Sequence, residues 1–449
     1  MKSITIFSLL AFTISGCTST KIGQTNQSSR RFDFGGSAPT AFTKVNTAGI
    51  YNDAIGYGFE RGADVRFVSR NGDALKDGFA TSEKPFYFSV KVPEGNYDVK
   101  VTLGDQQGSS DVAIRAENRR MMINRLQTKP GEVRTVEFTL HIRDSLIRNA
   151  TGVYSKVRLK PRERDYFHWD NKLTLEFNGS QPKVDAIEIT PAAADVITIF
   201  LAGNSTEVDQ AEEPYTAWGQ MFPSFFVPVK VVVANYAESG ESLSSFIGEK
   251  RFEKQLSLMK GGDFAFVQFG HNDQKQKGAG VGAFTSFKKD LKYYISEVKK
   301  KGGIPVLVTS MQRRSFDSSG KIMETLGDYP EAVRQTAREE NVALIDLNAM
   351  SKIMYEAWGP EESLKAFVHY PANSFSGQTK ALADNTHFSP YGAYEISKII
   401  VKGIKESVPA LTEFLKAETP DFNPAKPDPF ASFYWPPSPS TASVKPDGN

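Results

Sequence analysis

Residues 196–206 read Val-Ile-Thr-Ile-Phe-Leu-Ala-Gly-Asn-Ser-Thr, and this stretch decides the fold of the second half of the chain. Its continuous apolar run is typical of a strand buried on both faces of a parallel sheet. Comparable runs recur at 231–233, 264–269, 304–308 and 343–347. Helical stretches at 284–300 and 329–340 lie between them. The pattern therefore predicts βαβ units that build an α/β/α three-layer domain around a parallel sheet.

The preceding part of the chain has a different pattern, in which apolar and polar residues alternate over short segments. Three such segments begin near Tyr97, Val136 and Leu173, and Gly, Pro or Asn separates them. Period-two alternation over many short runs indicates an antiparallel β-sandwich, and we expect no helix in it. We therefore expect a multidomain chain with a sandwich at 31–192, a three-layer domain at 193–415 whose last helix begins at Pro390, and a Pro/Ser-rich tail at 416–449.

The first residues are typical of an exported protein. Met1-Lys2-Ser3 precedes an apolar run too short to span a bilayer, and residues 14–17 read Ile-Ser-Gly-Cys. This ending resembles a bacterial lipobox, so we expect a signal peptide at 1–16, a linker at 17–30 and a lipid anchor on Cys17. The protein would then be a lipoprotein that faces the periplasm or sits at the outer membrane or cell surface. An ordinary cleaved signal peptide with an incidental cysteine is the alternative.

Charge and cysteine content narrow the possible partners and cofactors. The 54 basic and 52 acidic side chains nearly cancel, and no basic run is interleaved with aromatic residues, so we expect no nucleic-acid partner. Cys17 is the single cysteine, which excludes an intramolecular disulfide and a cysteine-based metal site. His141 and His168 have no metal-ligand spacing, and we expect neither a metal nor another cofactor.

Polar residues or glycines follow three of the predicted strands. Ligands bind at the carboxyl ends of the strands in an open parallel sheet, so these residues are candidates for an active site. Ser205 follows a glycine turn and could act as a nucleophile, although a simple helix N-cap is the common role of such a serine. Gly240 follows the second strand, and its unobstructed N–H could face a developing oxyanion. Asn272, within Gly-His-Asn-Asp at 270–273, follows the third and offers an amide donor.

A second polar motif, Asp384-Asn385-Thr386-His387, lies just before the last helix. A carboxylate and an imidazole three positions apart share one face of a helical turn. We therefore expect Asp384 to hold one ring nitrogen of His387 and leave the other as a general base. Taken alone, such a pair is more often a helix cap and a solvated ion pair.

In this order, a serine, a glycine amide, an asparagine amide and Asp-x-x-His resemble the SGNH (GDSL-like) hydrolase family. The sequences at residues 200–206, 270–273 and 384–389 resemble motifs of the rhamnogalacturonan acetylesterase branch of this family, carbohydrate esterase family 12. The resemblance covers about residues 197–407 and implies a flavodoxin-like parallel sheet. The start of the sandwich, Phe32-Asp33-Phe34-Gly35-Gly36, is similar to galactose-binding-like modules.

The resemblance assigns a role to each motif residue. Ser205 becomes the nucleophile, His387 its base and Asp384 the residue that orients the imidazole. The N–H groups of Ser205 and Gly240 and the side chain of Asn272 form the oxyanion hole. The family usually has Asp where this chain has Asn204, and we expect Asn204 to keep the local hydrogen bonds without the charge.

Further residues are expected around this site. Trp218, His271 and Tyr370 are the candidates for sugar contacts, with a core position as the alternative for Trp218. Glu238 and Glu241 lie beside the oxyanion glycine, and we expect Arg313 and Arg314 to offset their charge.

These residues together imply a serine esterase that removes O-acetyl groups from an acetylated plant cell-wall polysaccharide, with rhamnogalacturonan favoured. Acetylated xylan or another acylated glycan is the first alternative, because specificity lies in loop shapes around a common acyl pocket. A catalytically silent glycan-binding surface lipoprotein is the second alternative. The presence of Ser205, Asp384 and His387 argues against it.

Overall fold

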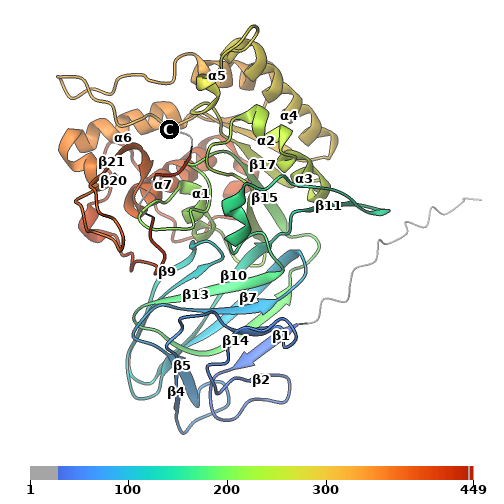
Figure 1. Cartoon of the computed structure of the whole chain (residues 1–449), viewed down its shortest axis with the longest axis vertical. Helices are drawn as coiled ribbons and strands as arrows, with labels where there is room; N and C mark the ends of the chain where they lie inside the picture. The colour runs from blue at the N-terminus through green and yellow to red at the C-terminus, as the bar shows by residue number, and fades with distance from the viewer. Residues whose placement is uncertain (1–28, 443–444, 448–449) are drawn as a thin grey trace, which may run out of the picture.

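Two domains pack against each other along the long axis of the molecule (Figure 1) in the computed structural model, which describes residues 29–442 and 445–447. The predicted order, a β-sandwich followed by a three-layer domain with a parallel sheet, is confirmed. The expected signal peptide and the lipid anchor on Cys17 lie outside the described residues. Among the residues that are described, no helix combines the length and the apolarity needed to cross a bilayer.

The N-terminal domain consists of two facing sheets. One has seven strands in the order β10-β7-β14-β1-β2, with β5 and β4 attached at β14, and the other has five in the order β3-β6-β13-β8-β9. Their bounds are β1 (Arg30–Asp33), β2 (Thr43–Lys44), β3 (Tyr57–Phe59), β4 (Arg66–Ser69), β5 (Gly78–Thr81), β6 (Phe86–Lys91), β7 (Gly95–Asp105), β8 (Ser110–Ala116), β9 (Arg120–Thr128), β10 (Glu132–Ile142), β13 (Lys172–Gln181) and β14 (Lys183–Pro191).

Alternation along the strands decides which side chains enter the sandwich core. In β7, Val99, Val101 and Leu103 are fully buried between the sheets, whereas Lys100 is exposed on the outer face. The period-two pattern of the sequence is therefore the pattern of burial, as expected for a sheet with one solvated face.

The segment between β10 and β13 leaves the sandwich and packs on the other domain. It contains the hairpin of β11 (Leu146–Asn149) and β12 (Gly152–Lys156) and a short 3₁₀ helix, η1 (Pro161–Asp165). Ile147, Val157 and Trp169 of this segment belong to a core of the second domain. The prediction that this half contains no helix is wrong at η1, where Pro161 starts a single turn.

The second domain has a parallel sheet in the order β16-β15-β17-β18-β19, which is the flavodoxin-like order 2-1-3-4-5. Its strands are β15 (Ile197–Ala202), β16 (Val231–Asn235), β17 (Phe264–Val267), β18 (Ile304–Val308) and β19 (Ala343–Ile345). The helices are α1 (Trp218–Met221), α2 (Leu243–Gly248), α3 (Arg251–Leu258), α4 (Lys288–Lys300), α5 (Tyr329–Glu340), α6 (Leu347–Glu362), α7 (Pro390–Ser407) and α8 (Pro409–Thr412).

Helices cover both faces of this sheet, and each face has its own core. Ile199 and Leu201 of β15 enter the core beneath α1, α6 and α7, whereas Phe200 and Ala202 enter the core beneath α2 to α5. A strand with cores on both sides needs apolar residues at successive positions, which explains the unbroken apolar run at 199–202. The strand order reverses beside β15, so Ser205 emerges at the topological switch point of the sheet.

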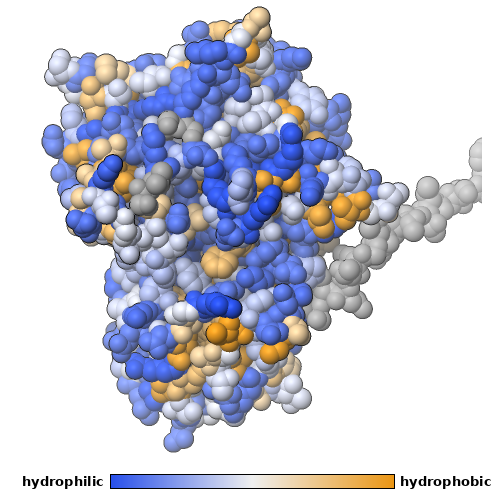
Figure 2. Space-filling model, in the orientation of Figure 1, coloured by the Kyte–Doolittle hydropathy of each residue, from blue (hydrophilic) through white to orange (hydrophobic). Residues whose placement is uncertain are grey.

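The tail after α8 runs back over both domains. The Trp435 ring lies 3.6 Å from the guanidinium carbon of Arg115 in the sandwich, and its Nε1 donates to Glu213 of the second domain. Ser438 continues this bridge by accepting a 2.6 Å hydrogen bond from Arg115. Figure 2 shows a largely hydrophilic surface over the second domain and more apolar side chains gathered on the sandwich face in view.

Candidate active site

Three side chains from distant parts of the chain form a hydrogen-bonded row at the carboxyl end of the parallel sheet. Ser205 Oγ lies 2.8 Å from His387 Nε2, and His387 Nδ1 lies 2.8 Å from Asp384 Oδ2. Ser205 follows β15, and its two partners stand 179 and 182 residues later, in β21 (Leu382–Phe388). The structure thus brings together the residues predicted as nucleophile, base and orienting acid.

The local structure around Asp384 differs from the predicted helical turn. Asp384 and His387 lie in strand β21, which pairs antiparallel with β20 (Phe367–Tyr370). They meet because Asp384 Oδ1 accepts hydrogen bonds from the N–H groups of Thr386 and His387, at 2.8 and 3.0 Å, and so bends the backbone around its carboxylate. This leaves Oδ2 to accept the hydrogen bond of the imidazole.

The same contacts fix the charge of Asp384. Burial alone would raise its pKa, but the hydrogen bond and charge of His387 and the two backbone N–H groups outweigh burial and lower the pKa to about 2. Asp384 is therefore ionised at neutral pH, so a full negative charge faces Nδ1 of the imidazole.

Two backbone N–H groups near Ser205 lack a protein acceptor within the described part of the chain. They belong to Ser205 itself and to Gly240, whose φ of +85° lies in the left-handed region that favours glycine. Buried N–H groups are nearly always paired, so unpaired ones beside a nucleophile suit a ligand oxygen. Asn272 Nδ2 donates one hydrogen bond to Glu241 O at 2.9 Å and keeps a second hydrogen.

Asp273 fixes the loop that carries Asn272. Its Oδ1 accepts from the Leu243 N–H at 2.8 Å and its Oδ2 from the Gly270 N–H at 2.9 Å, which ties the loops after β16 and β17 together. Burial raises the pKa of Asp273 to about 7 despite these hydrogen bonds. Asp273 therefore braces the loop that carries Asn272.

Asn204 stabilises the turn that presents the nucleophile. Its Oδ1 accepts from the Thr206 N–H at 3.1 Å and from the Thr206 hydroxyl at 3.0 Å. An aspartate could accept the same two hydrogen bonds, so Asn204 keeps the local role without the charge, as expected.

The sequence did not point to two glutamines that also hold the nucleophile turn. Gln210 Nε2 donates to Ser205 O at 3.0 Å, and Gln268 Nε2 donates to the Thr206 hydroxyl at 2.9 Å. Gln268 stands directly after β17, in the run of polar strand-end residues, and that position was the available signal. Gln210 had no comparable signal because it lies in an irregular loop.

One of the three predicted sugar contacts is wrong. Trp218 is 0% exposed and donates from Nε1 to Gln268 Oε1 at 3.0 Å, so it is a core residue that supports the site. His271 is 2% exposed, about as little as Ser205, and its contact with substrate stays a prediction. Tyr370 is half-buried against Phe375, with ring centroids 5.0 Å apart, and its contact with substrate stays a prediction.

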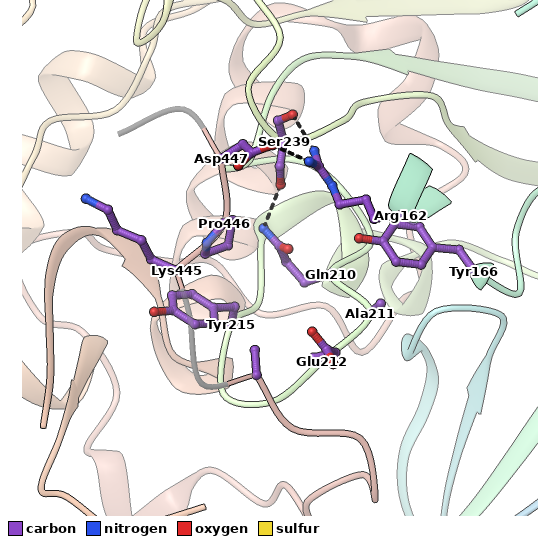
Figure 3. Close-up of a pocket in the computed structure, with 11 residues that line it drawn as sticks. Arg162, Tyr166, Gln210, Ala211, Glu212, Tyr215, Ser239, Lys445, Pro446 and Asp447 are labelled. Atoms are coloured by element: carbon purple, nitrogen blue, oxygen red, sulfur yellow. Dashed lines mark hydrogen bonds and ion pairs between the residues drawn. The ribbon is translucent and has the colours of Figure 1, made fainter. Parts of the chain in front are cut away.

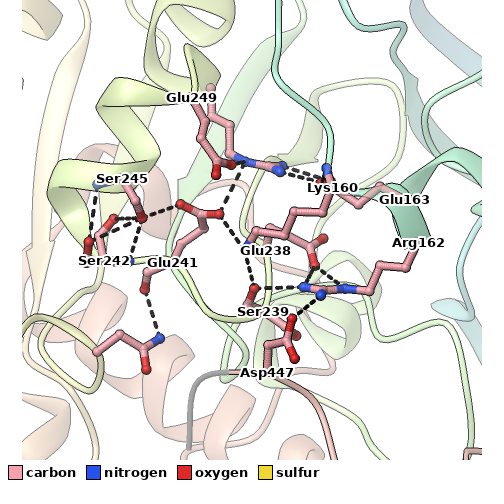
Figure 4. Close-up of polar contacts among 12 residues, drawn as sticks. Lys160, Arg162, Glu163, Glu238, Ser239, Glu241, Ser242, Ser245, Glu249 and Asp447 are labelled. Atoms are coloured by element: carbon pink, nitrogen blue, oxygen red, sulfur yellow. Dashed lines mark hydrogen bonds and ion pairs between the residues drawn. The ribbon is translucent and has the colours of Figure 1, made fainter. Parts of the chain in front are cut away.

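The charges beside the oxyanion glycine are balanced by the N-terminal domain (Figure 4). Arg162 Nη2 lies 2.6 Å from Glu238 Oε1, and Lys160 Nζ lies 2.7 Å from Glu241 Oε1. Burial and the neighbouring Glu163 carboxylate raise the pKa of Glu238 to about 7. The prediction that Arg313 and Arg314 offset these charges is wrong, because Arg313 bonds to Thr325 and His271, and Arg314 to Ser363, Pro360 and Asn385.

One cluster of side chains has the composition of a metal site. It consists of Glu163, His168 and Glu238, and one potential ligand atom from each lies within 4.8 Å of the other two. The carboxylates are already engaged, however, because Glu163 accepts from Arg251 and Trp169, and Glu238 accepts from Arg162. Two guanidinium groups in direct contact with these carboxylates also repel a cation. We therefore interpret this cluster as part of the domain interface.

A pocket of about 130 Å³ adjoins the nucleophile (Figure 3). Gln210, which holds the Ser205 carbonyl, lies in its wall. Tyr215, whose ring centroid is 5.8 Å from that of His387, lies in the wall as well. The pocket therefore borders the Ser205–His387 row, and it is lined by Arg162, Tyr166, Gln210, Ala211, Glu212, Tyr215, Ser239, Ala442, Lys445, Pro446 and Asp447.

Comparison with known proteins gives matches to both domains. The GDSL-like lipase/acylhydrolase family model matches residues 200–393, and the beta-agarase/YXIM esterase-like, galactose-binding domain-like model matches residues 30–147. Rhamnogalacturonan acetylesterase RhgT of Bacillus subtilis (strain 168) is 42% identical over 212 residues, which are 47% of this chain and 90% of that protein.

Two further relatives come from the same organism. The probable rhamnogalacturonan acetylesterase YesY is 34% identical over 49% of this chain and 98% of its own length. The uncharacterized esterase YxiM is 26% identical over 84% of this chain and 90% of its own length, so its similarity extends across both domains. The chain therefore belongs to the GDSL-like lipase/acylhydrolase family, the SGNH ester hydrolases, and carries a galactose-binding-like domain before its hydrolase domain.

Proposed function

We propose that this protein is a serine carbohydrate esterase that removes O-acetyl groups from the pectic polysaccharide rhamnogalacturonan. The observation that carries the proposal is the hydrogen-bonded row of Ser205, His387 and Asp384 beside N–H groups without protein acceptors. The names of two relatives, at 42% and 34% identity, support an acetylated pectin as the substrate.

Acylation begins at Ser205. His387 Nε2 accepts the hydroxyl proton as Oγ attacks the acetyl carbonyl carbon, and the ionised Asp384 stabilises the imidazolium that forms. The N–H groups of Ser205 and Gly240 and the Asn272 amide donate to the oxyanion of the tetrahedral intermediate. The C–O bond to the sugar then breaks, and His387 returns the proton to the departing sugar hydroxyl.

Deacylation uses the same groups. Water attacks the acetyl-serine carbonyl while His387 Nε2 removes a proton from it, and the second tetrahedral intermediate is held by the same three donors. Collapse of this intermediate breaks the bond to Ser205 Oγ, which regains its proton from His387, and acetate leaves.

Acetate release from acetylated rhamnogalacturonan, acetylated homogalacturonan and acetylated xylan, measured side by side, tests the proposal. We expect the highest kcat/KM on rhamnogalacturonan and no release from any substrate with Ser205→Ala. Equal or faster release from xylan would contradict the proposed substrate. If the native protein failed to hydrolyse even a small chromogenic acetate, the esterase chemistry itself would be wrong.

We further propose that the chain is exported and anchored by a lipid on Cys17, on the strength of the lipobox-like Ile-Ser-Gly-Cys at 14–17. In bacterial cells fed an alkyne-tagged fatty acid, the wild-type protein should acquire the label and fractionate with membranes. Cys17→Ser should lose both properties. An equally labelled Cys17→Ser protein would disprove anchoring at this residue.

A further inference from the structure

Arg162 brings its guanidinium to the pocket beside Ser205. The residue belongs to η1 of the N-terminal domain. Its Nε and Nη2 donate to Glu238 Oε1 at 3.2 and 2.6 Å, and Nη2 also donates to Ser239 O at 2.9 Å. These contacts hold the plane of the guanidinium against the loop that carries Gly240. Nη1 is left for Asp447, which lines the same pocket (Figure 3).

A carboxylate from the chain's own tail occupies that side of Arg162. Within the described residues, the partner of Nη1 is Asp447, with which it forms an ion pair (Figure 4). The Asp447 side chain is 66% exposed and that of Arg162 is 31% exposed, so this ion pair faces solvent. Exposed ion pairs of this kind are weak and exchange readily with dissolved anions.

The tail carboxylate also lies close to the reaction centre. A β-carbon placed on Gly240 would come within 3.2 Å of Asp447 Cβ, so Asp447 packs directly on the glycine whose N–H is predicted to donate to the oxyanion. A substrate carboxylate that replaced Asp447 would therefore be held within one sugar unit of the acetyl group under attack. Tyr166, Tyr215 and Gln210 line the remaining wall with ring and amide groups suited to a sugar.

We propose that Arg162 is a specificity-determining residue that binds the carboxylate of a uronate unit at or next to the acetylated sugar, and that Asp447 fills this subsite in the free protein. The inference rests on the proposed function, because it names a chemical feature of the substrate of the same site. A planar guanidinium fixed on its far side by Glu238 suits a carboxylate, the group that already sits there. Binding of the substrate then requires the tail to move away.

The decisive measurement compares two forms of one substrate within each variant. An acetylated rhamnogalacturonan oligosaccharide is assayed with free uronate carboxylates and after their methyl esterification, and the ratio of the two kcat/KM values is recorded. A substitution that displaces the loop carrying Gly240 should lower both kcat/KM values by the same factor. The ratio therefore reports only recognition of the substrate carboxylate. We expect the wild-type protein to prefer the free carboxylate.

Variants at Arg162 and at its neighbour Arg164 separate local contact from net charge. Arg164 belongs to the same η1 turn, is exposed, and does not line the pocket. Arg162→Gln should lower the ratio about 3- to 10-fold, as expected for one partly exposed charge-assisted contact, and Arg162→Lys should keep part of it. Arg164→Gln should leave it within about twofold. Equal ratios in Arg162→Gln and Arg164→Gln would overturn the proposal.

Removal of the tail carboxylate should have the opposite effect on binding. Asp447→Asn removes the competing carboxylate, so it should lower KM for the uronate form. An unchanged KM for the uronate form in Asp447→Asn would contradict the assignment of Asp447 as an occupant of the subsite. This variant also decides the question if Arg162→Gln fails to fold.

A binding experiment separates this inference from the proposed function. Titration calorimetry of unacetylated digalacturonate into Ser205→Ala needs no turnover, and binding should weaken when Arg162→Gln is added to that background. If the native protein hydrolyses no ester but digalacturonate binds through Arg162, the esterase proposal fails and the carboxylate subsite stands. If the protein is active but its binding of digalacturonate does not depend on Arg162, the carboxylate subsite fails and the esterase proposal stands.

Discussion

An ion pair buried between the two domains gives a sharp test of how they depend on each other. Arg120 of β9 lies against Asp209 of the hydrolase domain, and both residues are 1% exposed. Asp209 Oδ2 accepts from Arg120 Nε at 3.0 Å and from Nη2 at 2.7 Å, and Oδ1 accepts from Asn235 Nδ2 at 2.9 Å. Water cannot replace the guanidinium without opening the interface.

The expected cost of Arg120→Met follows from this burial. The substitution leaves the Asp209 carboxylate buried with Asn235 as its remaining side-chain donor, which should lower the free energy of unfolding by about 3–5 kcal/mol. Arg125 and Asp111 provide a matched control, because their nitrogen–oxygen distance is 2.8 Å but the Arg125 side chain is 40% exposed. Arg125→Met should cost less than about 1 kcal/mol.

Urea denaturation followed by tryptophan fluorescence and by circular dichroism measures both costs under the same conditions. The double variant Arg120→Met/Asp209→Asn should recover more than half of the loss, since it removes the unpaired charge. Equal shifts of the unfolding midpoint for Arg120→Met and Arg125→Met would refute the argument from burial. A double variant no more stable than Arg120→Met would show that the unpaired carboxylate is not the cause.

Three other predictions concern the site and its surroundings. Asp384→Asn should lower kcat about 10³- to 10⁴-fold with little change in KM, because the imidazolium loses its ionised partner. Steady-state kinetics on a chromogenic acetate tests this prediction, and a loss of kcat below tenfold would contradict it. Asn272→Ala should lower kcat about 10²- to 10³-fold if its second amide hydrogen donates to the oxyanion, with the nearby half-buried Gln274→Ala as a control that stays near wild type. Burial raises the pKa of Glu207 well above its ordinary value, and the backbone N–H of Asn204 offsets only part of this effect. Because the pKa of Glu207 is higher in the folded protein than in the unfolded chain, stability falls as pH rises past the unfolded pKa. The stability advantage of Glu207→Gln over wild type should therefore increase between pH 5 and 7 in urea titrations. An advantage that does not change with pH would contradict this.

The sequence predicted correctly the helices and strands whose formation depends only on neighbouring residues. The strand at 304–308 and the helix beginning at Pro390 lie at the predicted positions, because an unbroken apolar run and a Ser-Pro helix start each require only neighbours in sequence. The contact between Asp384 and His387 was predicted correctly, but the two residues lie in a strand and not in the predicted helical turn. A spacing of three residues suits a helical turn, but a carboxylate that accepts neighbouring N–H groups brings the same side chains together within a strand.

The roles of Lys160, Arg162 and Glu163 were not predictable from local sequence. In the stretch Lys-Pro-Arg-Glu-Arg, alternating charges after a proline are typical of a solvated turn. Their ion-pair partners Glu238, Glu241 and Arg251 lie at least 76 residues further along the chain, and only the packing of one domain on the other brings them together. The two glutamates next to Gly240 were a signal that cations should be nearby, but the sequence could not show which ones.

The N-terminal domain contributes charged residues to the surroundings of the Ser205 site. Two buried glutamates lie beside Gly240, whose N–H is predicted to donate to the oxyanion, and negative charge there would oppose the charge that develops in the transition state. The cations in contact with these glutamates are Lys160 and Arg162 of the N-terminal domain and Arg251, whose guanidinium is itself held by Glu163 of that domain. Without this domain, Glu238 and Glu241 would each lose a direct cationic partner, and Arg251 would lose its closest one. The compensation of charge next to Gly240, and with it the position of the Gly240 N–H, thus depends on the interface between the two domains.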